Sequence, residues 1–318
     1  MPRICERFKI RDLVSNQLNV TSNQDPFLVN PWGLVIDNNT IWVANNGSGV
    51  LTHYDFCGRS LLPSSVNLPL NNGNASPTGL VKNKTNGFQI EESPSLLLVA
   101  TTEGLVYAYN PNVDPNSAIL VIDNSASGAV YTGIAIADDK LYLADFHNAK
   151  ITVYDNEFNI ILTGFFFVDP EIPSGYAPFN IVTIGNKLYV TYAKQDFNKE
   201  KPVAGEGFGY VSVFRFDGTF VRRFASRHHL NAPWAIVETL EECGGDLLIG
   251  NTGDGFINVF SKCGEFKGTL RNRCGECIVI DGLHDLKFDC VCDRLYFTAG
   301  PDAQVNGLLG FIQKIDKH

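Results

Sequence analysis

The chain has 318 residues, of which 44% are hydrophobic and 19% charged, and its formal net charge is −9 at pH 7. This balance is typical of a folded globular chain and excludes a disordered or fibrous protein. The acidic excess argues against a nucleic-acid partner, whose binding depends on neutralising phosphates, and no apolar run is long enough for membrane insertion.

A phrase of three short strands begins near residue 30. It consists of Asn-Pro-Trp-Gly-Leu-Val at 30–35, Ile-Trp-Val-Ala-Asn at 41–45 and Leu-Thr-His-Tyr-Asp at 51–55. Similar phrases begin near residues 76, 131, 177, 232 and 282. Apolar alternation bounded by Gly, Asn and Asp predicts strands, and no stretch sustains a helical period.

The spacing of the phrases predicts the fold. Their equivalent residues are separated by 46 to 55 residues and fall at Gly33, Gly79, Gly133, Asn180, Ala235 and Asp285. This interval fits one four-stranded blade with its loops, so we expect an all-β chain, a single six-bladed β-propeller domain over residues 1–318. The last phrase ends after its third strand. We therefore expect residues 8–14 to supply the fourth strand and close the ring.

One end of the propeller, here called the top face, collects polar side chains. In an antiparallel blade, the first strand begins and the second strand ends at the same end of the sheet. The candidate ligand-binding residues gathered there are Trp32, Asn45, Asn46, Asp145, His147, Asn180, Trp234, Asn251, Asp254 and His284. Such a ring suits a protein or a polar small ligand, but Asn and Asp also satisfy loop backbone groups, and both explanations stay open.

Two longer segments are expected to overhang the top face. Residues 194–210 interrupt the fourth repeat between its second and third strands, and residues 165–176 precede that repeat. Loops of such length are either functional or decorative, so a lid over a pocket and a plain loop are both consistent with the sequence.

Several phrases resemble an uncharacterised family of mainly bacterial six-bladed propellers, some of whose members are exported with a C-terminal sorting tail. The phrases are Asn-Pro-Trp-Gly-Leu, Trp-Val-Ala-Asn-Asn-Gly, Leu-Ala-Asp-Phe-His-Asn, Gly-Tyr-Ala-Pro-Phe-Asn-Ile and Gly-Asn-Thr-Gly-Asp-Gly. More distantly, the repeats are similar to NHL-type propellers. The resemblance implies the fold and no particular chemistry.

The repeats also allow comparison with gluconolactonase-type propellers, which hold one divalent cation on the axis to polarise a lactone carbonyl. Candidate ligands here are Asn45, Asp145, Asn180 and Asn251, but Asn30-Pro31-Trp32 stands where that group has a glutamate. The sequence contains no nucleophile elbow and no zinc-protease helix motif. We therefore favour a non-catalytic binding or scaffold propeller, with a metal-dependent lactonase or esterase as the alternative.

The cysteines leave three explanations open. Eight lie at positions 5, 57, 243, 263, 274, 277, 290 and 292. The spacing of Cys274, Cys277, Cys290 and Cys292 resembles a zinc site, whereas Cys5 is a candidate disulfide partner for Cys290 or Cys292 if the N-terminal strand closes the ring. Free thiols are the third explanation. The location accordingly stays open between export after loss of a leader, a particle such as a virion, and the cytoplasm.

Overall fold

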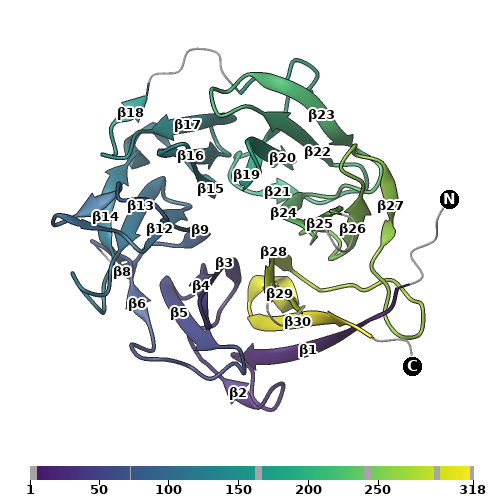
Figure 1. The fold of residues 1–318 in the computed structure, drawn as a ribbon, viewed down its shortest axis with the longest axis horizontal. Helices are drawn as coiled ribbons and strands as arrows, with labels where there is room; N and C mark the ends of the chain where they lie inside the picture. The colour runs from purple at the N-terminus through teal and green to yellow at the C-terminus, as the bar shows by residue number, and fades with distance from the viewer. Residues whose placement is uncertain (1–5, 72, 162–166, 240–244, 290–293, 316–318) are drawn as a thin grey trace.

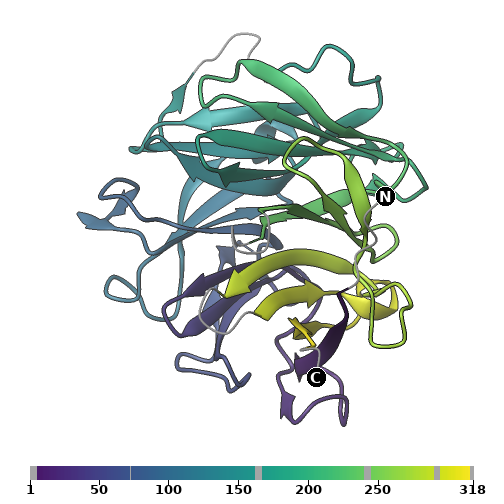
Figure 2. The same cartoon turned by 45° about the vertical axis from the view of Figure 1, so that its right-hand side comes forward.

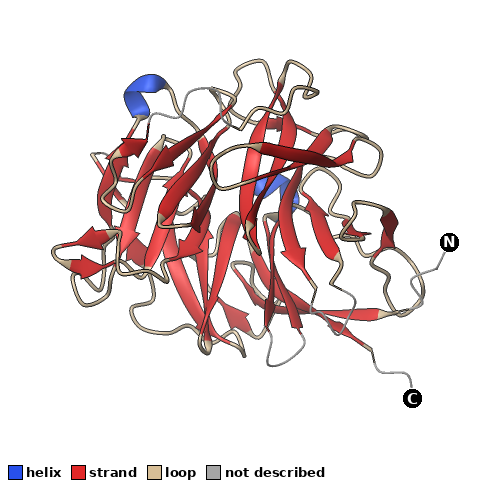
Figure 3. Cartoon of the chain, turned by 45° about the horizontal axis from the view of Figure 1, so that its top comes forward, coloured by secondary structure: helices blue, strands red, loops and turns tan. Residues whose placement is uncertain are grey.

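A computed structural model describes residues 6–71, 73–161, 167–239, 245–289 and 294–315. Nearly all regular structure in this part of the chain is β-strand (Figure 3). Six antiparallel sheets stand around a central axis, with their first strands innermost (Figure 1). The predicted six-bladed β-propeller is confirmed.

The strands of the first three blades follow the repeats closely. From the axis outward, blade 1 contains β3 (Pro31–Asp37), β4 (Thr40–Asn45), β5 (Val50–Asp55) and β6 (Val66–Asn67). Blade 2 contains β9 (Pro77–Lys82), β12 (Leu97–Thr101), β13 (Leu105–Tyr109) and β14 (Ile119–Asp123). Blade 3 contains β15 (Tyr131–Ala137), β16 (Lys140–Asp145), β17 (Lys150–Tyr154) and β18 (Ile160–Ile161).

The last three blades are built in the same way. Blade 4 contains β19 (Tyr176–Ile184), β20 (Lys187–Gln195), β22 (Gly209–Phe214) and β23 (Phe220–Ser226). Blade 5 contains β24 (Pro233–Glu238), β25 (Leu247–Asn251), β26 (Ile257–Phe260) and β27 (Phe266–Thr269). Blade 6 contains β28 (Leu283–Asp289), β29 (Arg294–Ala299), β30 (Leu308–Lys314) and β1 (Phe8–Ser15).

Shorter elements decorate this frame. They are β2 (Asn23–Gln24) beside β1, β21 (Pro202–Val203) beside β20, the pairs β7 (Pro69–Leu70) with β8 (Gly73–Asn74) and β10 (Gln89–Ile90) with β11 (Ser93–Pro94), the 3₁₀ turn η1 (Ser125–Ser127) and α1 (Pro301–Gln304). In α1, Asp302 and Ala303 both have a φ of 56°, so this element is a left-handed turn rather than an ordinary helix. No helix in the described ranges is long and apolar enough to span a membrane.

The core lies between the blades because both faces of each sheet meet a neighbour. Trp42 of blade 1, for example, packs on Tyr109 of blade 2 with their ring centroids 5.5 Å apart. The apolar residues of the repeats therefore face other blades, as expected for a radial stack of twisted sheets.

The ring is closed by the N-terminal strand. β1 runs antiparallel to β30, with a register from Phe8 opposite Lys314 to Ser15 opposite Leu308. In Figures 1 and 2 these two strands, from opposite ends of the colour scale, lie side by side. The predicted closing strand at 8–14 is confirmed, and Val14 of this strand is almost fully buried.

At three junctions, which we call glycine seams, the inner strands of successive blades meet through glycine. A Cβ at Gly33 would lie 2.6 Å from the backbone nitrogen of Leu80, and one at Gly79 would lie 2.9 Å from that of Ile134. Gly133 is equally crowded by blade 4. The inner strands of blades 1 to 4 therefore lie too close to admit a side chain.

At two other junctions, which we call side-chain seams, a polar side chain occupies the same repeat position. Asn180 of blade 4 donates through Nδ2 to the carbonyl oxygen of Trp234 in blade 5, at 2.9 Å. Asp285 of blade 6 accepts from the backbone N–H of Leu34 in blade 1, at 3.0 Å. These side chains satisfy backbone groups at the free edges of the inner strands.

Candidate functional site

The axis is filled on its top side by five rings, which we call the aromatic plug: Trp32, Phe146, Phe179, Trp234 and His284. Trp32 lies 6.2 Å from Phe179 and 6.1 Å from Trp234, both edge-on, and Phe146 lies 5.4 Å from Phe179. Blades 1 and 4 are opposite in a six-bladed ring, so the contact between Trp32 and Phe179 crosses the axis. The exposed fractions of Trp32, Trp234 and His284 are only 7%, 2% and 0%.

His284 is held as a neutral ring inside the plug. Its imidazole stacks on Trp32 with centroids 4.5 Å apart. Burial lowers the pKa of His284 to about 3, against the weaker opposing effect of the nearby carbonyls of Pro31 and Gly282. At neutral pH this ring is therefore an uncharged aromatic surface, and complete burial makes it a poor proton donor to solvent.

Three of the predicted polar residues lie at the ends of second strands and brace the adjoining turns. Asn45 donates to the Thr52 hydroxyl at 2.9 Å, and Asn251 donates to the carbonyl oxygen of His229 at 2.8 Å. The carboxylate of Asp145 accepts from the backbone and side-chain nitrogens of Asn148 at 3.1 and 2.9 Å. All three are buried, so they hold loops from beneath.

The remaining top-face candidates join neighbouring loops. Asn46 accepts from the Asn30 amide at 3.2 Å and donates to the carbonyl oxygen of Pro77 in blade 2, also at 3.2 Å. Asp254 accepts from the Asn231 amide at 3.1 Å. His147 is half-buried at the rim. Together with the bracing residues, these contacts give the top face a fixed shape.

The candidate metal ligands do not share a common hydrogen-bonded cluster. Asn180 and Asp145 use their oxygens on backbone N–H groups, whereas the buried Oδ1 atoms of Asn45 and Asn251 have no hydrogen-bond partner in the described ranges. Within those ranges, no three His, Cys, Asp or Glu side chains are grouped in a way that could hold a metal ion. The four residues thus offer isolated oxygens rather than a charged cage.

The long insertion of blade 4 presents an aromatic side chain to solvent. Phe197 is fully exposed at the tip of the loop between β20 and β21. The Asp196 carboxylate accepts from the backbone N–H groups of Glu200 and Lys201 at 2.8 and 3.2 Å, which fixes the tip. Gln195 ties the base of the loop to blade 3 by donating to the carbonyl oxygen of Phe146 at 2.6 Å. The sequence flagged this loop by its length but did not single out Phe197.

On the other side of the plug the axis is open. This cavity, which we call the axial channel, has a volume of about 330 Å³, and all six blades contribute inner-strand residues to its wall. Trp234, Asn180 and Asp285 bound it toward the plug, whereas Lys82 and Lys84 lie where β9 ends. The channel therefore faces the lower face, where inner strands turn into second strands. No feature of the sequence predicted this channel.

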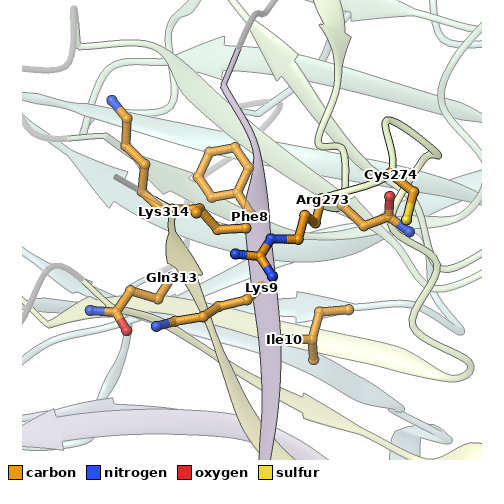
Figure 4. Close-up of a pocket in the computed structure, with 9 residues that line it drawn as sticks. Phe8, Lys9, Ile10, Arg273, Cys274, Gln313 and Lys314 are labelled. Atoms are coloured by element: carbon orange, nitrogen blue, oxygen red, sulfur yellow. The ribbon is translucent and has the colours of Figure 1, made fainter. Parts of the chain in front are cut away.

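A second cavity of about 520 Å³ lies on the outer rim beside the ring closure (Figure 4). It is lined by Phe8, Lys9, Ile10, Asn272, Arg273, Cys274, Gln313, Lys314 and Ile315. In Figure 4 Lys9 extends from β1, and Arg273 reaches toward that strand from the loop after β27. Its wall is open and built mainly from exposed residues.

The structure describes only four of the eight cysteines, so it tests the cysteine predictions only in part. Cys57, Cys263 and Cys274 are exposed, Cys277 is half-buried, and these four form no disulfide with one another. Cys5, Cys290 and Cys292 lie outside the described residues, as does Cys243. Both the zinc site and the stapling disulfide therefore stay predictions.

Comparison with known proteins identifies viral relatives. The chain is 42% identical to uncharacterized protein R648 of Acanthamoeba polyphaga mimivirus, in an alignment covering 98% of this chain and 82% of the relative. It is 38% identical to uncharacterized protein L690 of the same virus, covering 98% and 87%. No protein-family model matches. These relatives do not support the expectation of a mainly bacterial family.

Solved structures share the fold at low sequence identity. Virginiamycin B lyase from Staphylococcus aureus has a TM-score of 0.58 at 11% identity, covering 97% of this chain and all of the lyase chain. A gluconolactonase from Xanthomonas campestris has a TM-score of 0.53 at 14% identity, covering 91% and 88%. A chain of a nidogen/laminin complex also has a TM-score of 0.53 at 14% identity, covering 80% and 83%. At these identities the likeness extends to the fold alone.

Proposed function

The chain belongs to the family of the mimivirus proteins R648 and L690, and from that premise we propose that it is a binding propeller that holds a protein partner on its top face. The observation that carries the proposal is the fully exposed Phe197 on a loop whose backbone is fixed by Asp196. Aromatic side chains of this kind are frequent anchors of protein interfaces.

The fixed loop supports binding through its low entropic cost. The backbone of residues 196–201 is already ordered by hydrogen bonds that Asp196 accepts. Its side chain accepts from the N–H of Lys201, and its backbone carbonyl oxygen accepts from the N–H of Lys199 at 3.1 Å. A partner that covers Phe197 would gain apolar burial without ordering the loop. Lys194 lies 4.2 Å above the Phe208 ring at the base of the loop, which further limits movement there.

The rest of the top face supports the same function. The plug and the bracing bonds of Asn45, Asp145 and Asn251 hold the loops in one arrangement, which favours rigid recognition. Propellers related in fold occur both in a nidogen/laminin complex and among enzymes, so the fold accommodates either role.

The test compares two exposed apolar residues, one on the top face and one on the outer edge of the ring. Phe197→Ala removes the top-face anchor, and Leu62→Ala is the matched control, because Leu62 is 89% exposed in the segment that runs along the outer edge of blade 1 beside β5. Tagged proteins are used for cross-linked capture from Acanthamoeba lysate, with quantitative mass spectrometry. We expect wild type and Leu62→Ala to retain a protein that Phe197→Ala loses. Equal capture by all three would refute the top-face proposal.

A separate assay addresses the hydrolase alternative. Purified protein is analysed for bound metal and then assayed on a lactone and ester panel with and without chelator. We expect no chelator-sensitive turnover, because the charged oxygens of Asp145 are occupied by N–H donors. Turnover that chelator abolishes and Asn45→Ala reduces would favour the hydrolase instead.

A further inference from the structure

We propose that the axial channel is a second binding site, independent of the top face, and that it takes a small organic monoanion with a short aliphatic body, such as a medium-chain carboxylate. The channel lies on the far side of the plug from Phe197, and its walls, charge and size each restrict the ligand.

The channel is a blind pocket. Trp234 belongs both to the plug and to the channel wall, so the plug forms the inner end. Asn180 and Asp285, which also line this end, already bond to the backbone of the next blade. The inner end therefore has few polar atoms left to offer, and the cavity opens toward the lower face.

The walls favour an aliphatic ligand body. Between its ends the channel is lined largely by aliphatic side chains from the inner strands, among them Val35, Val81, Ile136 and Val182, with Phe288 from blade 6. Val81, Ile136, Val182 and Phe288 are only half-buried, although they stand near the axis of the ring. A ligand body placed there would remove these groups from water.

The charge of the residues around the channel favours a ligand with a single negative charge. Lys82 is paired with Asp37, and Lys287 is paired with Asp285 at 2.8 Å. Lys84 also lines the channel, is exposed, and has no ion pair in the described ranges. Three lysines against two aspartates leave an excess of one positive charge among these residues, in a protein whose net charge is −9. Lys84 also borders a neighbouring cavity that contains Asp139 and Glu157.

The size excludes larger partners. A volume of about 330 Å³ lies at the lower end of the range for small-molecule pockets. A folded protein partner cannot enter, whereas a carboxylate of about ten heavy atoms fits with its head near Lys84 and its chain along the wall.

Calorimetric titration of the whole protein with octanoate tests the proposal, with 1-octanol as the uncharged probe of the same length. We expect saturable binding of one octanoate, about fivefold tighter than that of octanol, from one partly solvated charge contact. Lys84→Met should remove most of this preference and leave octanol binding unchanged. Lys187→Met is the matched control, because Lys187 begins the second strand of blade 4 on the same face but does not line the channel.

A second variant locates the ligand. Val182→Phe narrows the channel at a half-buried position and should weaken octanoate and octanol alike, with circular dichroism confirming an intact fold. Equal affinity of the two probes for wild type, equal effects of Lys84→Met and Lys187→Met, or no saturable binding up to millimolar octanoate would each overturn the proposal. None of these results bears on capture by Phe197, so the two proposals fail separately.

Discussion

The two halves of the ring join their inner strands in different ways. From blade 1 to blade 4 the seams are glycine seams, in which backbone meets backbone, whereas Asn180 and Asp285 build side-chain seams later in the chain. All of these residues occupy the same position in the repeat. In a glycine seam the strands meet closely because no side chain lies between them, whereas in a side-chain seam a side chain joins the two strands by a hydrogen bond.

The comparison teaches that the same repeat position can hold either a glycine or a hydrogen-bonding side chain in a closed ring. Glycine has a cost in backbone entropy on folding, whereas a buried carboxylate or amide requires that its partners be present. Closure of the ring depends on β1, because inside blade 6 this strand is joined to β30 by strand pairing and not by a direct chain connection, while Asp285 bonds the inner strand of blade 6 to that of blade 1.

Deleting residues 6–15 should open the ring inside blade 6 and have the largest effect. The deletion removes seven paired positions along β30 and uncovers apolar core near Val14. Each lost interstrand hydrogen bond contributes about 1 kcal/mol, and their sum approaches the free energy of unfolding of a typical protein. We expect loss of the cooperative melting transition in circular dichroism. A truncated protein that melts at the wild-type temperature would show that the ring closes without β1.

Gly79→Ala should break a glycine seam by crowding. The new Cβ would lie 2.8 Å from a side-chain carbon and 2.9 Å from the backbone nitrogen of Ile134, so blades 2 and 3 must move apart. We expect a loss of about 2–3 kcal/mol in urea unfolding. Ala235→Gly, the reverse change at the equivalent position of blade 5, should cost about 1 kcal/mol or less. The comparison fails if the two variants lose the same stability.

Asp285→Ala should weaken a side-chain seam by leaving the N–H groups of Leu34 and Leu286 without their acceptor. We expect a loss of about 1–2 kcal/mol in urea unfolding. Asp285→Asn keeps a carbonyl acceptor and should lose less, because the Lys287 partner is partly exposed and contributes little as an ion pair. Equal losses for Ala and Asn would assign the stabilisation to the charge instead.

His284 should make the stability of this region depend on pH. Its folded pKa of about 3 lies below the usual value of 6.5, so between these values the unfolded chain binds a proton that the folded chain does not. Stability should therefore fall as the pH drops from about 6.5 toward 3, by at most about 1.4 kcal/mol per pH unit. His284→Phe keeps a ring against Trp32 and should flatten the profile of melting temperature between pH 7 and 4. An unchanged profile would assign the acid sensitivity to other groups.

The repeated phrases predicted three strands in every blade, as well as the closing strand, because buried inner strands carry a clear apolar alternation. They did not predict the positions of the outer strands of blades 1 to 5. β18 has only two residues, and Phe266 and Lys267 of β27 are exposed, so the alternation fades where one edge and much of each face meet solvent. Short hairpins such as β7–β8 carry even less of the pattern.

The sequence predicted at which end of the ring the candidate residues lie, but it did not predict how deeply their side chains are buried. Strand direction placed Trp32 and Trp234 at the top end of the ring, but it did not give the inner diameter, which decides whether rings from opposite blades meet. Trp32 reaches Phe179 across the axis, so both tryptophans are core residues. The sequence contains one weak indication of the axial channel, namely lysines at or near the ends of inner strands, at Lys82 and Lys287.

The pairing of β1 with β30 also has a mechanical consequence. Phe8 lies opposite Lys314 at the end of the ladder from which both strands leave the sheet, and the interstrand hydrogen bonds run across the strands. Tension applied to the two ends of the chain would therefore peel β1 away one bond at a time instead of shearing the whole ladder at once. We expect a ring that melts as one unit in heat to open under small pulling forces at this single joint.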